Sequence, residues 1–317
     1  MPQNICEYLR EEAVGGLFKL NTVNKAWPIW QEVIKDKISH WNAVNVIDLG
    51  DYLSEIFRST GSSDRSQSSV SGGGTGWEAL VCWYLNLCLL ESRTVVVKFK
   101  NSLIPQPIRD AITVKYGTFP SNTESDLIAI TFPDKADYIS TDKFNIIARD
   151  NQGSLIDTKI GRNNKFNYLP IINSLTDRDF NDFEIGIIQC KTNWNDNAQI
   201  PMLWDMIYSS KGFEGHRTTV GSSIYSIKDI RRFTYSFVTV PTSSEGGSKI
   251  TPNSTCVKRV QNLSGGNYWG KPTANSVAYS LKEIFGRNFS SASSHGLRIS
   301  LNSALPQLKN TYSYFNI

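Results

Sequence analysis

Short apolar segments near the middle of the chain predict buried strands. The segments RTVVVKF (93–99) and SDLIAITF (125–132) are rich in β-branched residues, and FEIGIIQCK (183–191) is equally apolar until its end. A fourth segment, RRFTYSFVTV (231–240), alternates polar and apolar residues as a strand does. The pattern therefore predicts four strands in the middle part of the chain.

Helical periodicity precedes and follows these strands. Residues 27–41, with Pro28 suited to the first turn, and residues 46–57 space their apolar side chains at helical intervals. The Ser/Gly-rich segment 60–76 is expected to be a flexible loop. Further helices are expected after Gly76, at 197–208 and at 273–285, the last with Thr273 as its N-cap.

The third predicted strand ends in two polar residues, Gln189 and Lys191. Side chains two positions apart point to the same face of a strand, so an amide oxygen and an ammonium group are presented side by side. Unpaired polar groups are costly in a core, so a purely structural strand has no reason to end in this way. The pattern favours a site for a metal ion and a charged substrate. For Lys191 alone, a surface lysine whose stem covers apolar residues is the structural alternative.

Composition excludes several kinds of site. The five cysteines are scattered, and none has CxxC or Cys/His spacing, so we expect free thiols in a reducing compartment without disulfides or zinc. With only three histidines, histidine-based metal sites and triads are disfavoured. The sequence has no GxxxxGK[ST] motif for a nucleotide cofactor, no visible signal peptide and no apolar run long enough to span a membrane. We expect a soluble, cytoplasmic protein.

The net charge of +4 is unevenly divided along the chain. Residues 192–317 carry 13 Lys and Arg against 6 Asp and Glu, a net charge of +7, whereas residues 1–191 carry 20 against 23, a net charge of −3. A basic C-terminal part suits a polyanionic partner. Chance clustering on a solvated surface is the other interpretation of the same charges.

The middle of the chain is predicted to run helix, strand, strand, strand, helix, strand. Glu78 lies near the start of the first helix, Asp126 near the start of the second strand, and Gln189-x-Lys191 at the end of the third. In this order the chain resembles the PD-(D/E)xK nuclease superfamily, which includes the type II restriction endonucleases, over residues 76–241. The resemblance implies an α/β (α+β) fold with a restriction-endonuclease-like core, in which helices flank a central mixed sheet.

The same elements divide the chain into three parts. Residues 1–75 are expected to form a helical N-terminal region that ends in the Ser/Gly-rich loop. Residues 76–241 would hold the catalytic core, with an insertion at about 133–182, because about 50 residues separate two of its strands. Residues 242–317 are expected to supply DNA-recognition or scaffold elements.

Three features depart from the usual pattern of the superfamily. The acid that normally precedes x-Lys is Gln189 here, and 63 positions separate it from Asp126. The literal Pro-Asp pair is Pro133 and Asp134, at the far end of its strand. Asp126 is favoured as the metal-binding aspartate because it precedes an apolar run, and Asp134 stays open as the alternative. Glu184 is disfavoured because an odd separation from Gln189 puts it on the opposite face of the strand.

The resemblance implies hydrolysis of phosphodiester bonds with Mg²⁺ as the cofactor. Asp126 would be the main carboxylate ligand, Gln189 would supply an amide oxygen, and the backbone carbonyl of Cys190 would add another oxygen. Lys191 would orient or help to deprotonate the attacking water. Glu78 would complete the acidic site; the alternative for Glu78 is a charge that stabilises the start of its helix.

Contacts to double-stranded DNA are expected outside this core. Asn193 and Asn195 follow the key strand, and further candidates are basic or aromatic: Lys228, Arg231, Arg232, Lys258, Arg259, Tyr268 and Lys271. For each of them a structural role or a solvated charge is the alternative. We expect a stand-alone type II restriction endonuclease that acts as a homodimer. A structure-selective or non-specific defence or repair nuclease of the superfamily, and an inactive DNA-binding relative, remain open as alternatives.

Overall fold

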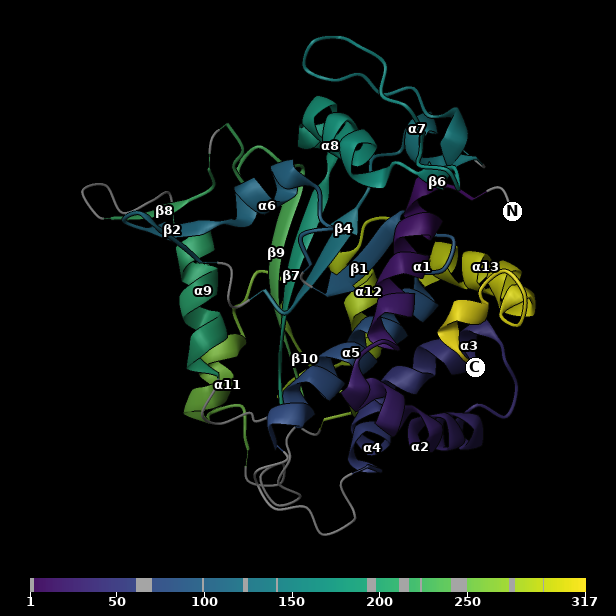
Figure 1. The fold of residues 1–317 in the computed structure, drawn as a ribbon. Helices are drawn as coiled ribbons and strands as arrows, with labels where there is room; N and C mark the ends of the chain where they lie inside the picture. Colours follow the sequence, from purple (N-terminus) through teal and green to yellow (C-terminus); the bar gives the residue numbers. More distant parts are fainter. Residues whose placement is uncertain are drawn as a thin grey trace.

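The computed structural model describes residues 3–60, 70–98, 100–121, 125–140, 142–192, 198–210, 217–222, 224–240, 250–273, 277–292 and 294–317. A six-stranded mixed sheet, in the order β1-β4-β7-β9-β10-β11, lies at its centre (Figure 1). Its strands are β1 (Thr94–Lys98), β4 (Leu127–Thr131), β7 (Glu184–Lys191), β9 (Arg232–Thr239), β10 (Asn267–Trp269) and β11 (Tyr279–Ser280). The first four are the strands that the apolar pattern predicts, and the mixed α/β class is confirmed.

The direction of the strands changes at β7. β1 pairs antiparallel with β4, and β4 pairs antiparallel with β7. β7 pairs parallel with β9, and the parallel arrangement continues to β10 and β11. Every residue of β7 except Lys191 is buried, because helices cover both faces of the sheet. This explains why the segment is almost continuously apolar.

Two hydrophobic cores occupy the two faces of the sheet. The core that contains Val96, Leu127 and Cys190 is covered by α5 (Val70–Cys88) and by helices from both ends of the chain: α2 (Asn21–Lys37), α3 (Ala43–Asp48), α4 (Leu53–Arg58), α12 (Ile284–Asn288) and α13 (Ser294–Ala304). We call this side the α5 face. Figure 1 shows α5 running alongside the sheet.

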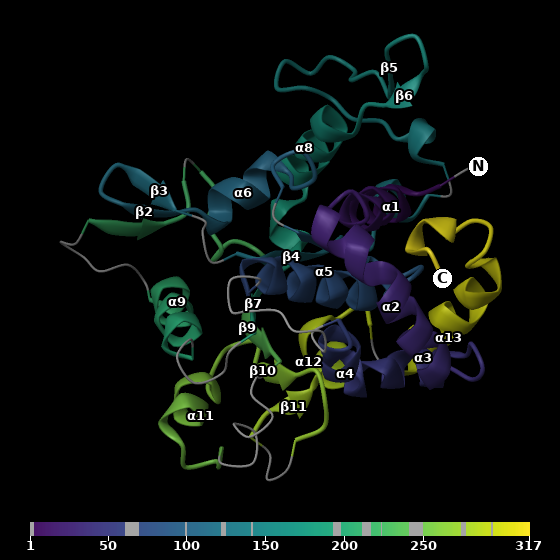
Figure 2. The ribbon, with the colours of Figure 1, turned by 60° about the horizontal axis from the view of Figure 1, so that its bottom comes forward.

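The core on the other face contains Val97, Ile128 and Ile187 and is covered by α1 (Ile5–Leu17), α6 (Gln106–Ile112) and α8 (Tyr168–Arg178). Tyr208 of α9 (Gln199–Ser209) also belongs to it, so we call this side the α9 face. A third, smaller core joins α11 (Thr255–Val260) to Phe237 and Trp269, and Figure 2 shows α11 beside α9.

Helix α5 begins earlier than the sequence predicts. The segment 60–76 was expected to be a loop, but residues 70–76 already belong to the helix; residues 61–69 lie outside the described residues. Glu78 is therefore well inside the helix and cannot act as a charge in its first turn. Glycine disfavours helices by only about 1 kcal/mol per residue, and Gly76 is packed against Trp30 and Phe57. Tertiary packing overrides the local preference.

The N-terminal helices also differ from the prediction. Helix α2 begins at Asn21 and carries Pro28 in its interior, and not in a first turn as expected. The segment 46–57 is divided between α3 and α4, which are separated by a short 3₁₀ turn at Leu49–Asp51.

Two expectations for the C-terminal part are wrong. The described part of 273–285 is not one helix but contains β11, a 3₁₀ turn and the start of α12, and the Gly-rich segment before it contains the buried strand β10, for which no strand was predicted. Thr273 caps no helix; its hydroxyl bonds to the carbonyl of Ala278. Strands of two or three residues are too short to show a period in the sequence.

The segment 133–182, predicted as an insertion, contributes to the core on the α9 face. It holds α7 (Ala136–Ile139), the short hairpin β5–β6 (Lys159–Ile160, Lys165–Phe166) and α8, whose Ile171 and Ile172 are fully buried against the sheet. A separate three-stranded sheet consists of β3 (Phe119–Ser121), β2 (Val114–Tyr116) and β8 (Thr218–Val220). Within the described residues, none of the helices is both long and apolar enough to cross a membrane.

Candidate functional site

The predicted site residues lie at one end of the sheet, where β1 and β7 finish and β4 begins. Lys98, the last residue of β1, is the register partner of Leu127, and Leu127 is the register partner of Ile188. Asp126 directly precedes Leu127 and therefore lies beside the end of β7. The antiparallel register thus brings together residues that are 63 positions apart in the sequence.

Asp126 and Lys191 form the centre of the site. The Nζ atom of Lys191 lies 3.8 Å from Oδ2 of Asp126, and both side chains are largely but not completely buried, with 25% and 13% of their surfaces exposed. The backbone N–H of Cys190 donates a hydrogen bond of 2.8 Å to the same Asp126 oxygen. The backbone of β7 and the ammonium group of its last residue therefore hold one carboxylate.

Gln189 lies on the face of β7 that was predicted. Ile187 belongs to the α9-face core, so the alternation of the strand puts Gln189 and Lys191 on that face as well. Gln189 is fully buried, and its Oε1 accepts a hydrogen bond of 3.2 Å from the hydroxyl of Tyr235. A neutral amide oxygen is one of the ligand types that magnesium accepts.

Glu78 lies at the same end of the sheet but on the α5 face. Its carboxylate is paired with the ammonium group of Lys98, which the alternation in β1 also directs to that face. Burial is the largest cause that raises the pKa of the Cys190 thiol, and the charges of Asp126 and Glu78 raise it further. Both carboxylates are thus close enough to influence the pKa of the same thiol.

The prediction from the sequence missed Lys98. A lysine at the end of an otherwise apolar β-branched segment is the same signal that singled out Lys191. Its partner Glu78 is 20 positions away, on a helix whose start was misplaced, so the pair could not be recognised from spacing.

The donors fit a magnesium ion that keeps most of its water. The described residues contain no group of three or more His, Cys, Asp or Glu that could hold a metal. Magnesium is typically bound by one or two carboxylates together with waters and substrate phosphates, and Asp126 supplies such a carboxylate. In an antiparallel ladder the N–H and C=O of one residue face the same neighbour, so the carbonyl of Cys190 also faces Asp126.

The two other acids considered for the site lie at the opposite end of the sheet. Asp134 follows the end of β4 and is 3.6 Å from Arg93. Glu184 begins β7 and accepts a hydrogen bond of 2.6 Å from Ser290. Asp126, and not Asp134, therefore lies beside Lys191.

The candidate DNA contacts divide into groups. Asn193 and Asn195 lie outside the described residues. Lys228, Arg231 and Arg232 lie at or before the start of β9, whose seven residue steps of about 3.3 Å put them about 23 Å from the Lys191 end. The structure therefore places these three candidates outside the core site, at the opposite end of the sheet from Lys191. Arg232 donates to the carbonyl of Arg287, and Arg231 lies 3.6 Å from Glu184.

Tyr268, a predicted DNA contact, does not reach the surface. Its side chain is fully buried, and its hydroxyl donates to Asn288 at 3.2 Å. Lys258 and Arg259 lie on α11, where Lys258 is exposed. Lys271 directly follows the buried turn at Gly270, at the same end of the sheet as Lys191.

Comparisons with known proteins add no assignment to this geometry. No protein-family model matches the chain, and no curated protein matches it.

Proposed function

We propose that the chain is a Mg²⁺-dependent endonuclease of the type II restriction kind, which hydrolyses phosphodiester bonds at a short specific site in double-stranded DNA. The observation that carries the proposal is the distance of 3.8 Å between Lys191 and Asp126 at the adjoining ends of two core strands. The order α5-β1-β4-β7-α9-β9, with β7 and β9 parallel, supports it because a PD-(D/E)xK-like core was expected to have this order.

Asp126 and Lys191 would divide the chemistry between them. Hydrolysis of a phosphodiester needs a water aligned with the phosphorus atom and positive charge near the phosphate oxygens. Asp126 and the Cys190 carbonyl would hold a magnesium ion, which when bound supplies charge and acidifies a water. Lys191 would orient the attacking water and offset the negative charge that develops on the phosphate.

Glu78 and Lys98 would together add no net charge on the α5 face of the site. In the pair as it stands, the charge of Glu78 is balanced by Lys98. The site therefore depends on Asp126 for its main carboxylate, more strongly than a site with a second acid at position 189 would.

Incubation of the purified protein with plasmid or phage DNA tests the proposal. Mg²⁺ should yield discrete fragments, EDTA should prevent cleavage, and sequencing of the fragment ends should give one short motif. A smear would assign the structure-selective or non-specific alternative. Because cleavage of both strands of a palindromic site suits two-fold symmetry, we propose that a homodimer is the active form, which light scattering of the purified protein tests.

An inactive DNA-binding relative is the second candidate. The bond from Tyr235 to Gln189 favours it, because the position that usually carries an acid is here neutral and already engaged. Salt-dependent DNA binding without cleavage in Mg²⁺ or Mn²⁺ would select this function over the first.

A further inference from the structure

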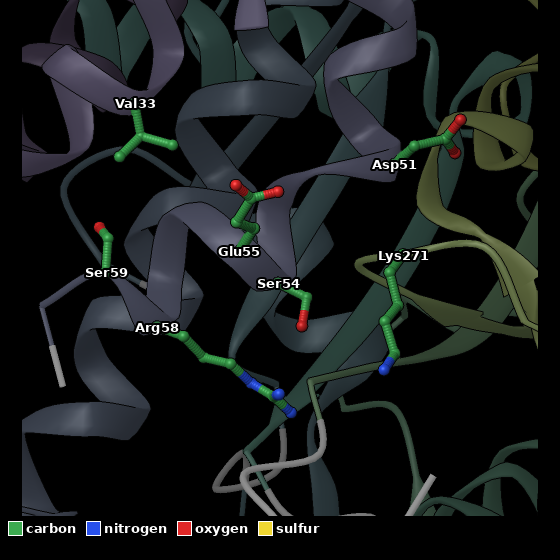
Figure 3. Close-up of a pocket in the computed structure, with 7 residues that line it drawn as sticks. All are labelled: Val33, Asp51, Ser54, Glu55, Arg58, Ser59 and Lys271. Atoms are coloured by element: carbon green, nitrogen blue, oxygen red, sulfur yellow. The ribbon is translucent and has the colours of Figure 1, made fainter. Parts of the chain in front are cut away.

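A pocket lined by charged and polar side chains opens near the end of the sheet that carries Lys191. It has a volume of about 480 Å³ and lies between α2, α4 and Lys271, two residues after the end of β10 (Figure 3). Arg58 and Ser54 of α4 line it on one side and Lys271 on the other. In Figure 3 the guanidinium of Arg58 and the ammonium of Lys271 extend toward the same space below Ser54.

The two cations of this pocket are not neutralised by the described residues. The Nε and Nη2 atoms of Arg58 are buried and have no hydrogen-bond partner there. Lys271 lies 5.3 Å from the ring centre of Trp269 and forms no ion pair with a described residue. Burial lowers the pKa of Arg58, and burial together with the charge of Arg58 lowers the pKa of Lys271. Buried donors without partners are costly, so such an arrangement needs a compensating function.

The acids that line the pocket are engaged elsewhere. Glu55 is paired with Lys37 at 2.9 Å, and Asp51 is paired with Lys282 at 2.7 Å. Figure 3 shows both carboxylates directed away from the space between Arg58 and Lys271. The pocket therefore offers two positive charges to a ligand.

The fold holds the two cations close together. The backbone N–H of Ser54 donates a hydrogen bond of 2.8 Å to the carbonyl of Gly270, which joins α4 to the end of β10. A Cβ atom on Gly270 would lie 2.7 Å from the ring of Trp77, so a larger residue would force this contact apart. Because Lys271 follows Gly270 directly, the glycine sets the position of the lysine beside Arg58.

The pocket is near the candidate active site. Lys191 is the register partner of Thr239, and Thr239 is the register partner of Trp269, two residues before Lys271. Adjacent strands lie about 4.8 Å apart, so about 10 Å separates the end of β7 from the end of β10. Each DNA strand carries one phosphate for about 3.4 Å of helix axis. Lys191 projects to the α9 face, and the pocket lies on the α5 face at the same end of the sheet. A duplex that crosses this end of the sheet would therefore present further phosphates to the pocket.

We propose that Arg58 and Lys271 form a subsite for a backbone phosphate of the DNA that is bound at Lys191. The guanidinium would bind two phosphate oxygens through the Nε and Nη2 donors, which form the geometry that suits bidentate contact. Lys271 would add a second charge and Ser54 a hydroxyl donor. The inference rests on the proposed DNA partner, and it adds residues from the N-terminal region and from the C-terminal part to the same binding surface.

The binding constant for a labelled DNA duplex of about 20 base pairs tests the subsite. It is measured by fluorescence anisotropy in EDTA at several salt concentrations. Arg58→Gln and Lys271→Met should each weaken binding and reduce the slope of log K against log salt by about one. Lys165→Met and Arg162→Gln, on the exposed β5–β6 hairpin, are the matched controls and should leave the slope unchanged. Thermal unfolding should show that Arg58→Gln is as stable as the wild type or more stable, because it removes a buried donor without a partner; a structural arginine would give a lower Tm.

Slopes equal to those of the wild type in both variants would overturn the subsite. Stabilisation by inorganic phosphate that Arg58→Gln abolishes, with an unchanged DNA slope, would also overturn it and assign the pocket to a free phosphate. Because the assay contains EDTA, it does not depend on cleavage. If the slopes fall in a protein that does not cut DNA, the subsite is supported and only the nuclease proposal is contradicted. If the slopes are unchanged in a protein that does cut DNA, only the subsite proposal is contradicted.

Discussion

Two carboxylates and two ammonium groups share the end of the sheet, and their pairing sets the charge of the site. Asp126 lies beside Lys191, and Glu78 is paired with Lys98. Each pair links two elements, so the charges also fix the relative positions of β4, β7, α5 and β1. The neutral side chain of Gln189 keeps the site less negative than one with an acid at this position.

The neutral residue at position 189 leads to a prediction about metal affinity. Gln189→Glu would place a carboxylate in a fully buried position near Asp126. Without metal, this substitution should lower the free energy of unfolding by about 1–3 kcal/mol. Mg²⁺ should reverse this loss because it binds only the folded state. Urea unfolding with and without Mg²⁺ measures both effects.

Gln189→Met is the control for this experiment, since methionine has a similar length and no charge. Its stability should not respond to Mg²⁺ more than that of the wild type does. Equal responses of the Glu and Met variants would contradict a metal site at this position.

Buried thiols predict a loss of stability at alkaline pH. Burial raises the pKa of Cys6 and of Cys82 from 9.0 to about 12. Between these values the unfolded chain releases protons that the folded chain retains, so the free energy of unfolding should fall by about 1.4 kcal/mol per thiol and pH unit. Urea unfolding at pH 8 and pH 10 measures this slope, and Cys82→Ala should reduce it. A stability that rises over this range would contradict the prediction.

At the scale of elements, apolar pattern alone located the four main strands but not the limits of the helices. A buried strand between covered faces needs apolar residues at nearly every position, and this pattern is visible in β1, β4 and β7. The start of α5 is hidden because its glycines have weak local preference, and its position depends on packing against α2 and α4.

The same distinction explains which site residues could be predicted. Asp126, Gln189 and Lys191 lie at strand ends, so the alternation of side chains was enough to place them on one face. The pairing of Lys98 with Glu78 and the placement of Arg58 and Lys271 in one pocket depend on the docking of α5, α4 and β10. No local pattern encodes that docking.

One buried cation links three elements of the scaffold. Arg10 of α1 is fully buried and donates to Glu7 at 3.1 Å, to Asn86 of α5 at 3.3 Å and to the carbonyl of Thr94 in β1 at 3.1 Å. Arg10→Met should lower the free energy of unfolding by about 3–5 kcal/mol, because it leaves the carboxylate of Glu7 buried without its partner.

A double-variant cycle in urea tests the origin of this effect. Glu7→Gln combined with Arg10→Met should be more stable than Arg10→Met alone, since no unpaired charge remains. Additive losses would contradict an energetic coupling between Arg10 and Glu7.

At the scale of the whole molecule, the chain combines distant segments at one end of its sheet. The N-terminal region supplies Arg58, the middle supplies Asp126 and Lys191, and the basic C-terminal part supplies Lys271. In the proposed DNA-binding surface, the three parts of the chain that the sequence suggested would act together. The excess of positive charge after residue 191 agrees with a polyanionic partner for this surface.

The rate of DNA cleavage by two aspartate variants tests the nuclease proposal most directly. Asp126→Asn removes the carboxylate beside Lys191, whereas Asp134→Asn removes an exposed carboxylate at the other end of the sheet. With saturating protein and Mg²⁺, cleavage by Asp126→Asn should be slower than by the wild type by a factor of about 100 or more, as expected when a group in the reacting centre is lost. Asp134→Asn should cut at the wild-type rate, and an Asp126→Asn protein that cuts equally fast would contradict the proposed active site.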